Sequence, residues 1–177
     1  MKNYVAKPQV GFTEAIQKNF SNLTNFTGRA RRSEFWWNVL VWCILSITVS
    51  FALSSLPAIN TVCGIIIMMC FLAVTARRLQ DSGHSAIWVY INFICVIALT
   101  LYLQFSGVQE DLLAVQQSGD PDKTLQIALS YFMSPLYLIP VTIGTITGIP
   151  TVIFCFMDSV FVANKYGESP KYVIEGE

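Results

Sequence analysis

The sequence has little charge, and long parts of it have none. Asp, Glu, Lys and Arg make up 12% of the 177 residues, whereas a water-soluble domain usually carries about 25%. No charged residue occurs within 35–76, 85–109 or 124–157. A helix needs about 20 apolar residues to cross the ~30 Å hydrocarbon core of a bilayer, and each stretch is long enough to supply at least one. The composition therefore excludes an ordinary soluble domain and predicts an integral membrane protein.

Four helices account for these stretches. Pro57 lacks the N–H that a helix interior needs, and Asn60 favours a turn, so the first stretch divides into two helices joined by a tight turn. A polar segment, 106–123, separates the last two helices. We predict an all-α, integral membrane four-helix bundle made of two transmembrane hairpins. Its membrane domain covers 35–161, and the expected spans are 35–54, 59–76, 86–105 and 134–158.

Positive charge lies almost entirely on one side of this arrangement. Six of the eleven Lys and Arg residues precede the first span, two lie between the second and third spans, and two follow the fourth. Lys123 lies in the 106–123 loop, together with four acidic residues. Loops rich in Lys and Arg stay in the cytoplasm. We therefore expect the N-terminal segment 1–34, the tail 162–177 and both termini to be cytoplasmic.

The N-terminal segment has a helical pattern and no features of a signal peptide. It contains no apolar run before residue 35, which a signal peptide would require. Phe12, Ile16, Phe20 and Leu23 recur at helical spacing with polar side chains opposite, which predicts a short amphipathic helix. That helix either lies in the membrane interface or packs as part of a cytoplasmic cap.

The loop before the fourth span also has helix signals. Asp120 is a candidate N-cap and Pro121 occupies a favoured first helical position, so we expect a short helix there. Pro140 and Pro150 lie within the fourth span, where each removes a main-chain donor, and a straight helix is not expected.

Two further sets of residues are candidates for membrane anchoring and helix packing. Trp36, Trp37 and Trp88 lie beside the basic segments, and tryptophan prefers the membrane interface. Gly144 and Gly148 form a small-x-x-x-small pattern that lets two helices approach closely, with nearby threonines to add hydrogen bonds. The glycines either seat the fourth span against another helix of the same chain or join two chains.

Two basic stretches and the tail carry a family resemblance. The stretches are FTGRARRSEFWW (26–37) and ARRLQDSGH (76–84), and the tail is NKYGESP (164–170). All three resemble signature segments of the DUF805 family, small bacterial inner-membrane proteins with four predicted helices and no established biochemical role. The resemblance extends over about 10–172 and implies an inner-membrane location. Gln80 departs from the histidine that is usual there, which weakens any role that depends on such a histidine.

The two basic stretches place arginines and acids at the same membrane face. On a helix, Glu34 is spaced to pair with Arg31, and Asp81 with Arg77. One hypothesis is that the charged residues converge into a single network that holds an anionic lipid headgroup, an acidic partner or only itself. The alternative is that they serve only as a topology signal. The residues concerned are Arg29, Arg32, Glu34, Arg77, Arg78 and Asp81.

Few residues are available for chemistry. His84 is the single histidine and is expected in a solvated loop, and the five cysteines form no Cys-x-x-Cys pair. A zinc site would lack ligands, and a Ser-His-Asp set would have to use His84. We therefore expect no catalytic residue, no cofactor and no bound metal. A net charge of zero and the lack of a recognisable module argue against nucleic acid as a partner.

The sequence favours a membrane scaffold or accessory protein. Pumps place ionisable residues at mid-depth within their spans, whereas the one charged residue in the spans expected here is Asp158, at the inner end of the fourth. The expected partners are membrane lipids, including anionic headgroups, and either further copies of the chain or an unidentified membrane protein. The alternative function is a small oligomeric transporter or pore, and the third is a membrane enzyme.

Overall fold

The computed structural model describes residues 3–118 and 121–175. Four long helices dominate this part of the chain: α2 (Arg32–Ala52), α3 (Pro57–Asp81), α4 (Ile87–Phe105) and α7 (Pro135–Phe156). Each is long and apolar enough to cross a membrane, with a mean hydropathy of 1.7 to 2.2. Large apolar side chains on them face outward, including Phe51 at 85% exposed and Phe105 at 80%. Only lipid can cover so much apolar surface favourably, so the predicted four-span fold is confirmed.

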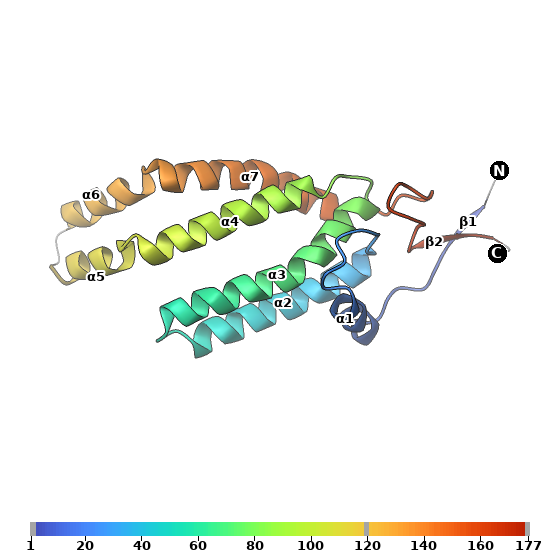
Figure 1. The fold of residues 1–177 in the computed structure, drawn as a ribbon, viewed down its shortest axis with the longest axis horizontal. Coiled ribbons are helices and arrows are strands. Elements are labelled where there is room, and N and C mark those ends of the chain that lie inside the picture. Colours follow the sequence, from blue (N-terminus) through green and yellow to red (C-terminus); the bar gives the residue numbers. More distant parts are fainter. Residues whose placement is uncertain (1–2, 119–120, 176–177) are drawn as a thin grey trace.

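The four helices form two antiparallel hairpins, α2–α3 and α4–α7 (Figure 1). Proline at the first position of α3 and of α7 suits a helix start, where no main-chain donor is needed. The hairpins pack on each other mainly at the end where both termini lie, which we call the termini end (Figure 1). A small core lies there, built on Phe35, Leu79, Val89 and Cys155.

The helix that contains the second expected span continues past the span's predicted end at residue 76. Helix α3 continues through Arg77 and Arg78 to Asp81 and has 25 residues. At about 1.5 Å per residue it is longer than the ~30 Å hydrocarbon core, so its last turns extend beyond the apolar layer. The arginines therefore belong to the helix and not to the loop that follows it.

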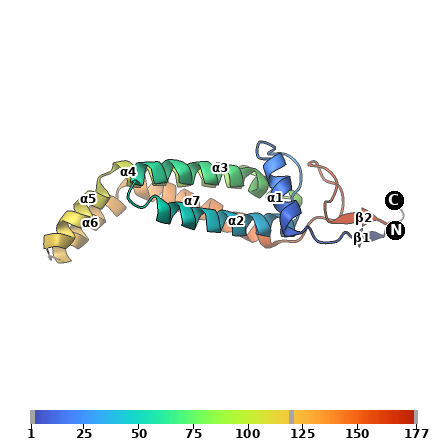
Figure 2. The same ribbon diagram turned by 90° about the horizontal axis from the view of Figure 1, so that it is seen from below.

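Two short helices lie at the opposite end of the molecule. Helices α5 (Val108–Ser118) and α6 (Pro121–Phe132) pair beyond the end of the α2–α3 hairpin (Figure 2). The Tyr131 hydroxyl donates to Asp111 Oδ2 at 2.5 Å across this pair. The predicted cap at Asp120 lies outside the described residues, but α6 does begin at Pro121. Helix α7 begins after Ser134 and runs without interruption past Pro140 and Pro150.

The chain ends meet at the termini end. Strands β1 (Tyr4–Ala6) and β2 (Tyr172–Ile174) pair antiparallel, with Val5 opposite Val173. Nothing in the sequence pattern indicated this pairing. Helix α1 (Phe12–Ser21) is the short N-terminal helix expected from the sequence.

Helix α1 combines features of its two expected placements. It packs on α2 through the fully buried Ala15, whose carbonyl accepts from Asn38 Nδ2 at 3.2 Å. Its other side leaves Phe20 67% exposed, as a helix at a membrane interface would.

Candidate functional site

Three segments that are distant in sequence meet at the C-terminal turn of α3. The last carbonyls of a helix have no partner within it, and here other segments supply donors. The Ala30 N–H donates to the Arg77 carbonyl at 3.1 Å, and the Val160 N–H donates to the Asp81 carbonyl at 3.1 Å. Asn164 Nδ2 donates to the Gln80 carbonyl at 2.9 Å. The segment before α2 and the segment after α7 are thereby fixed to the end of α3.

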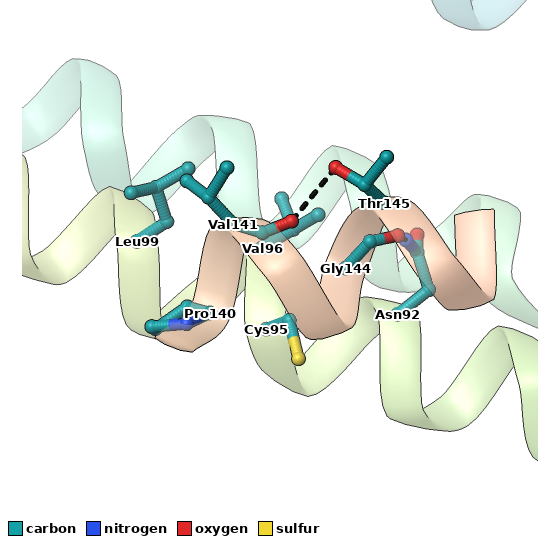
Figure 3. Close-up of a pocket in the computed structure, with 8 residues that line it drawn as sticks. All are labelled: Asn92, Cys95, Val96, Leu99, Pro140, Val141, Gly144 and Thr145. Atoms are coloured by element: carbon teal, nitrogen blue, oxygen red, sulfur yellow. Dashed lines mark hydrogen bonds between the residues drawn. The ribbon is translucent and has the colours of Figure 1, made fainter. Parts of the chain in front are cut away.

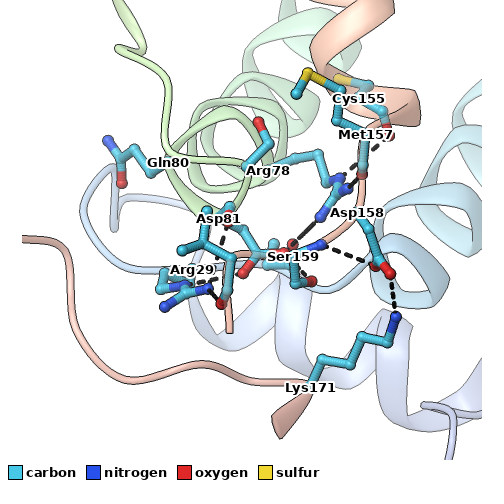
Figure 4. A network of polar contacts seen from close by, with 12 residues as sticks. Arg29, Arg78, Gln80, Asp81, Cys155, Met157, Asp158, Ser159 and Lys171 are labelled. Carbon is cyan, nitrogen blue, oxygen red and sulfur yellow. Dashed lines mark hydrogen bonds and ion pairs between the residues drawn. The ribbon is translucent and has the colours of Figure 1, made fainter. Parts of the chain in front are cut away.

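Asp81 lies at the centre of this junction and is fully buried (Figure 4). Its Oδ1 accepts from Arg29 Nε at 2.9 Å. Its Oδ2 accepts from Arg78 Nη1 at 2.5 Å and from the Ser159 hydroxyl at 2.5 Å. Two guanidinium groups and a hydroxyl therefore hold one carboxylate out of contact with water. We call Arg29, Arg78, Asp81 and Ser159 the Asp81 cluster.

The two arginines of the Asp81 cluster have further internal acceptors. Arg29 donates to the carbonyls of Val160 at 2.5 Å, Val162 at 3.0 Å and Gly167 at 3.3 Å. Such carbonyls satisfy the fixed fork of guanidinium donors without any external ligand.

Arg78 is satisfied in the same way at the end of α7. It donates to the carbonyls of Cys155 and Ala30, each at 3.2 Å, and to that of Met157. A cation is favourable at a helix C-terminus, where the helix dipole is negative. The Asp81 cluster thus holds chain segments together, and its arginines are turned away from solvent.

Glu34 and Arg77 form a looser, separate pair. Arg77 Nη1 lies 3.6 Å from Glu34 Oε1, and both side chains are buried. Neither Glu34 Oε1 nor Arg77 Nη2 has a hydrogen-bond partner among the described residues. The pairings expected from local spacing are wrong: Glu34 pairs with Arg77 of α3 and not with Arg31, and Asp81 pairs with Arg29 and Arg78 and not with Arg77. Tertiary packing supplies Arg77 to Glu34 and Arg29 to Asp81, whereas Arg78 reaches Asp81 from the i,i+3 position of the same helix.

Arg32 lies apart from both groups. It is exposed at the first position of α2, and the structure places neither Glu34 nor Asp81 in contact with it. Of the six charged residues singled out from the sequence, three meet in the Asp81 cluster and two form the looser pair.

An exposed ion pair closes the junction on the side of the tail. Lys171 Nζ donates to Asp158 Oδ2 at 2.5 Å, and the Tyr172 hydroxyl lies 3.3 Å from the same oxygen. Burial would raise the pKa of Asp158, but hydrogen bonds from Lys171 and the Ser159 N–H outweigh it and hold that pKa below its usual value. Burial would lower the pKa of Lys171, but its hydrogen bond to Asp158 raises it instead. Both groups are therefore charged at neutral pH.

The three tryptophans expected to anchor the protein at the membrane interface lie near the junction but differ in their contacts. Trp36 packs on Phe156 with ring centroids 4.7 Å apart, and Trp88 packs against the small core. Trp37 is exposed and meets Phe12 of α1 edge-on at 5.5 Å.

Gly144 and Gly148 face α4 within the same chain. A Cβ on Gly148 would lie 2.9 Å from Asn92 Nδ2, and one on Gly144 would lie 3.4 Å from Cys95 Cβ. Asn92 Nδ2 donates to the Gly144 carbonyl at 2.8 Å. Asn92 and Gly144 also border a shallow cavity of about 240 Å³ between α4 and α7 (Figure 3). The expected threonine bonds to a neighbouring helix are not formed, because Thr145 and Thr147 donate to carbonyls of α7 itself.

No cluster of three or more His, Cys, Asp or Glu residues suited to a metal occurs within 3–118 and 121–175. His84 is half-buried and not fully solvated as expected, because its ring stacks on Phe154 at 3.7 Å. All five cysteines are free thiols.

Residues 23–168 match the family described as Protein of unknown function (DUF805). The chain belongs to this family. It is 30% identical to the inner membrane protein YhaH of Escherichia coli over 97 residues, which is 50% of this chain and 80% of that protein. It is also 30% identical to YhaI of Escherichia coli, another inner membrane protein, over 48% of this chain and 75% of that one. No solved structure matches the chain. With its four spans, this DUF805 protein is a multi-pass protein of the inner membrane.

The DUF805 resemblance had drawn attention to Gln80, and the structure places this residue in the junction. Its Nε2 donates to the Phe26 carbonyl at 2.9 Å, which helps fix the first basic stretch against α3. An amide donor is sufficient for this contact, so the departure from histidine leaves the junction intact.

Sequence reasoning missed Ser159, Asn164 and the Asp158–Lys171 pair. Asn164 lies within the tail segment that resembles the family, which was a usable signal. Ser159 had no such signal, because a serine after an apolar helix is common in any membrane protein.

Proposed function

We propose that this protein is a non-catalytic scaffold or accessory protein of the inner membrane. Its termini end faces the cytoplasm and contacts anionic lipid or an acidic partner. The observation that carries the proposal is the placement of charge. The four spans have charged side chains only at the termini end, and the Asp81 cluster there joins three chain segments. Such an arrangement supports a fixed surface and offers no Asp, Glu, Lys, Arg or His at mid-membrane for a proton or ion path.

A transporter or pore is the second candidate, and one cavity favours it. A crevice of about 320 Å³ lies between α2, α3 and α4, bordered by polar side chains that include Ser46, Ser50, Asn60, Thr61 and Thr100. Hydroxyls and amides can replace part of the water around a polar solute. The enzyme alternative has no comparable observation among residues 3–118 and 121–175.

Flux through reconstituted vesicles separates the first two functions. The purified protein in vesicles should release trapped ions or a small fluorescent solute no faster than empty vesicles do. Flux above that background, reduced by Asn60→Leu in the crevice and unchanged by Asn25→Leu in the exposed segment before α2, would overturn the scaffold proposal and support a pore.

A photo-crosslinking residue tests the scaffold directly. Introduced at the exposed position 168 in native membranes, it should give discrete protein or lipid adducts, whereas the exposed position 113 of α5 should give few. Equal labelling from both ends would contradict a partner surface at the termini end.

A further inference from the structure

Three cations surround a cavity beside the junction. The cavity has a volume of about 330 Å³ and lies at the start of α2, where Arg31, Arg32 and Ser33 border it together with Trp36. Lys171 and Asp158 border it from the other side. We call it the α2 pocket. It differs from the Asp81 cluster, because the two arginines of that cluster do not border it.

The α2 pocket has a net positive charge. Asp158 is its one acid, and this carboxylate already pairs with Lys171 at 2.5 Å. Arg31 is fixed by donating to the carbonyls of Lys7 and Pro8. Arg32 is exposed, and no acceptor for it occurs within the part of the chain that the structure describes. Two positive charges therefore remain uncompensated, and one of them is on a side chain free to meet a ligand.

The start of α2 adds further donors that favour an anionic ligand. Arg31, the residue before the helix, provides no side-chain cap, and the first main-chain bond of the helix runs from the Phe35 N–H to the Arg31 carbonyl. The N–H groups of residues 32–34 are therefore open at the positive end of a 21-residue helix. Ser33 Oγ accepts from the Val10 N–H at 3.2 Å, so its hydroxyl proton remains available to a ligand. Phosphate oxygens suit this combination of amide, hydroxyl and guanidinium donors.

The depth of the α2 pocket indicates where such a phosphate would come from. Trp36 lies one turn further along α2, and the lipid-exposed Leu40 follows it by one more turn. The cations therefore lie at headgroup depth, with acyl-chain surface directly beneath them.

We propose that the α2 pocket binds the phosphate of an anionic phospholipid, through Arg32, Lys171 and the first amides of α2. The proposal rests on the proposed function only in placing the termini end at the cytoplasmic leaflet. It assigns the lipid contact to Arg32, which has no partner among the described residues, and to Lys171, whose ammonium has donors beyond the one that it gives to Asp158. Arg29 and Arg78 are engaged inside the protein.

Native mass spectrometry of the full chain tests this assignment. The protein in neutral detergent is titrated with phosphatidylglycerol or with phosphatidylcholine, and the apparent affinity for each is measured. Wild-type protein should prefer phosphatidylglycerol. Arg32→Gln should weaken that binding roughly fivefold, since a cation at an anionic surface contributes about 1 kcal/mol, and adding Lys171→Gln should weaken it further.

The control is Lys18→Gln with Lys165→Gln, which removes two exposed charges elsewhere at the same end. This control should retain the preference, and an equal loss in it would overturn the pocket in favour of a general charge effect. If Lys171→Gln disturbs the packing of the C-terminal tail, the lipid titration of the Arg32→Gln single variant still tests the proposal. Binding of inorganic phosphate without a preference for phosphatidylglycerol would overturn lipid as the occupant. Flux through vesicles would contradict the scaffold function but would leave the measured preference for phosphatidylglycerol unchanged. The scaffold proposal and the lipid-site proposal can therefore fail independently.

Discussion

At the scale of the residue, the Asp81 cluster is the feature of this protein that costs most free energy to bury. Removing charges from water is costly, and a buried ion pair is tolerated only when geometry is good and the remaining donors are satisfied. Both conditions hold here, because Arg29 and Arg78 direct their other nitrogens at main-chain carbonyls. The carboxylate therefore cannot be lost without leaving two buried cations unpaired.

Asp81→Asn should destabilise the protein strongly. Breaking a buried pair from one side costs about 3–5 kcal/mol, and we expect a loss of this order in chemical unfolding measured in detergent. The matched control is Glu14→Gln, which removes the acid of an exposed i,i+4 pair whose oxygen lies 2.6 Å from Lys18 Nζ. Exposed pairs of this kind contribute about 0.3–0.5 kcal/mol. Equal losses in the two variants would show that the Asp81 cluster stabilises the protein no more than an exposed ion pair does.

At the scale of the element, α4 and α7 show how two apolar helices associate in lipid. Lipid provides no hydrophobic force between spans, so close packing and hydrogen bonds must hold them together. Gly148 makes room for Asn92, whose amide then reaches the Gly144 carbonyl. The two glycines and Asn92 act as one contact between the helices.

Gly148→Ala should weaken the α4–α7 hairpin by about 1 kcal/mol, because the added methyl group displaces Asn92 from its acceptor. The measurement is the unfolding free energy in detergent. Gly64→Ala serves as the comparison, since a Cβ there meets nothing within 4 Å. It should change stability by no more than about 0.5 kcal/mol. A loss in Gly64→Ala as large as in Gly148→Ala would contradict the packing role of Gly148.

At the scale of the whole molecule, the protein is polar at both ends and apolar between them. The termini end carries the basic stretches, the β1–β2 pair and α1, whereas α5 and α6 form the other end (Figure 1). The imbalance of Lys and Arg between the two ends predicts which one faces the cytoplasm.

Cysteine labelling in intact cells tests this orientation. In a variant without the five native cysteines, Leu113→Cys should react with a membrane-impermeant maleimide, and Glu168→Cys should react only after the membrane is opened. Both positions are exposed in the structure, so protection reflects the membrane and not the fold. The reverse pattern would invert the topology and place the α2 pocket in the outer leaflet.

Several features could be predicted because they depend on local sequence. Bilayer thickness sets the length of a span, so uncharged stretches revealed all four long helices, and the basic stretches contained Arg29, Arg78 and Asp81. The contact between Arg29 and Asp81 could not be predicted from helical spacing, because the fold supplies Arg29 from 52 residues away, whereas Arg78 lies at the i,i+3 position of the same helix. The continuation of α3 to Asp81 could not be predicted either, since its arginines are satisfied by segments that only the fold brings near.

The sequence by itself determined that this chain is embedded in a membrane, crosses it four times and has most of its positive charge at one end. Hydrocarbon solvates apolar stretches regardless of their neighbours, so composition was sufficient for those conclusions. Only the tertiary structure decided which cations are engaged inside the protein and which remain available. That division depends on which carbonyl and carboxylate oxygens lie within hydrogen-bond reach of each cation. Most of these oxygens are far from the cation in sequence, and only the folded geometry brings them close.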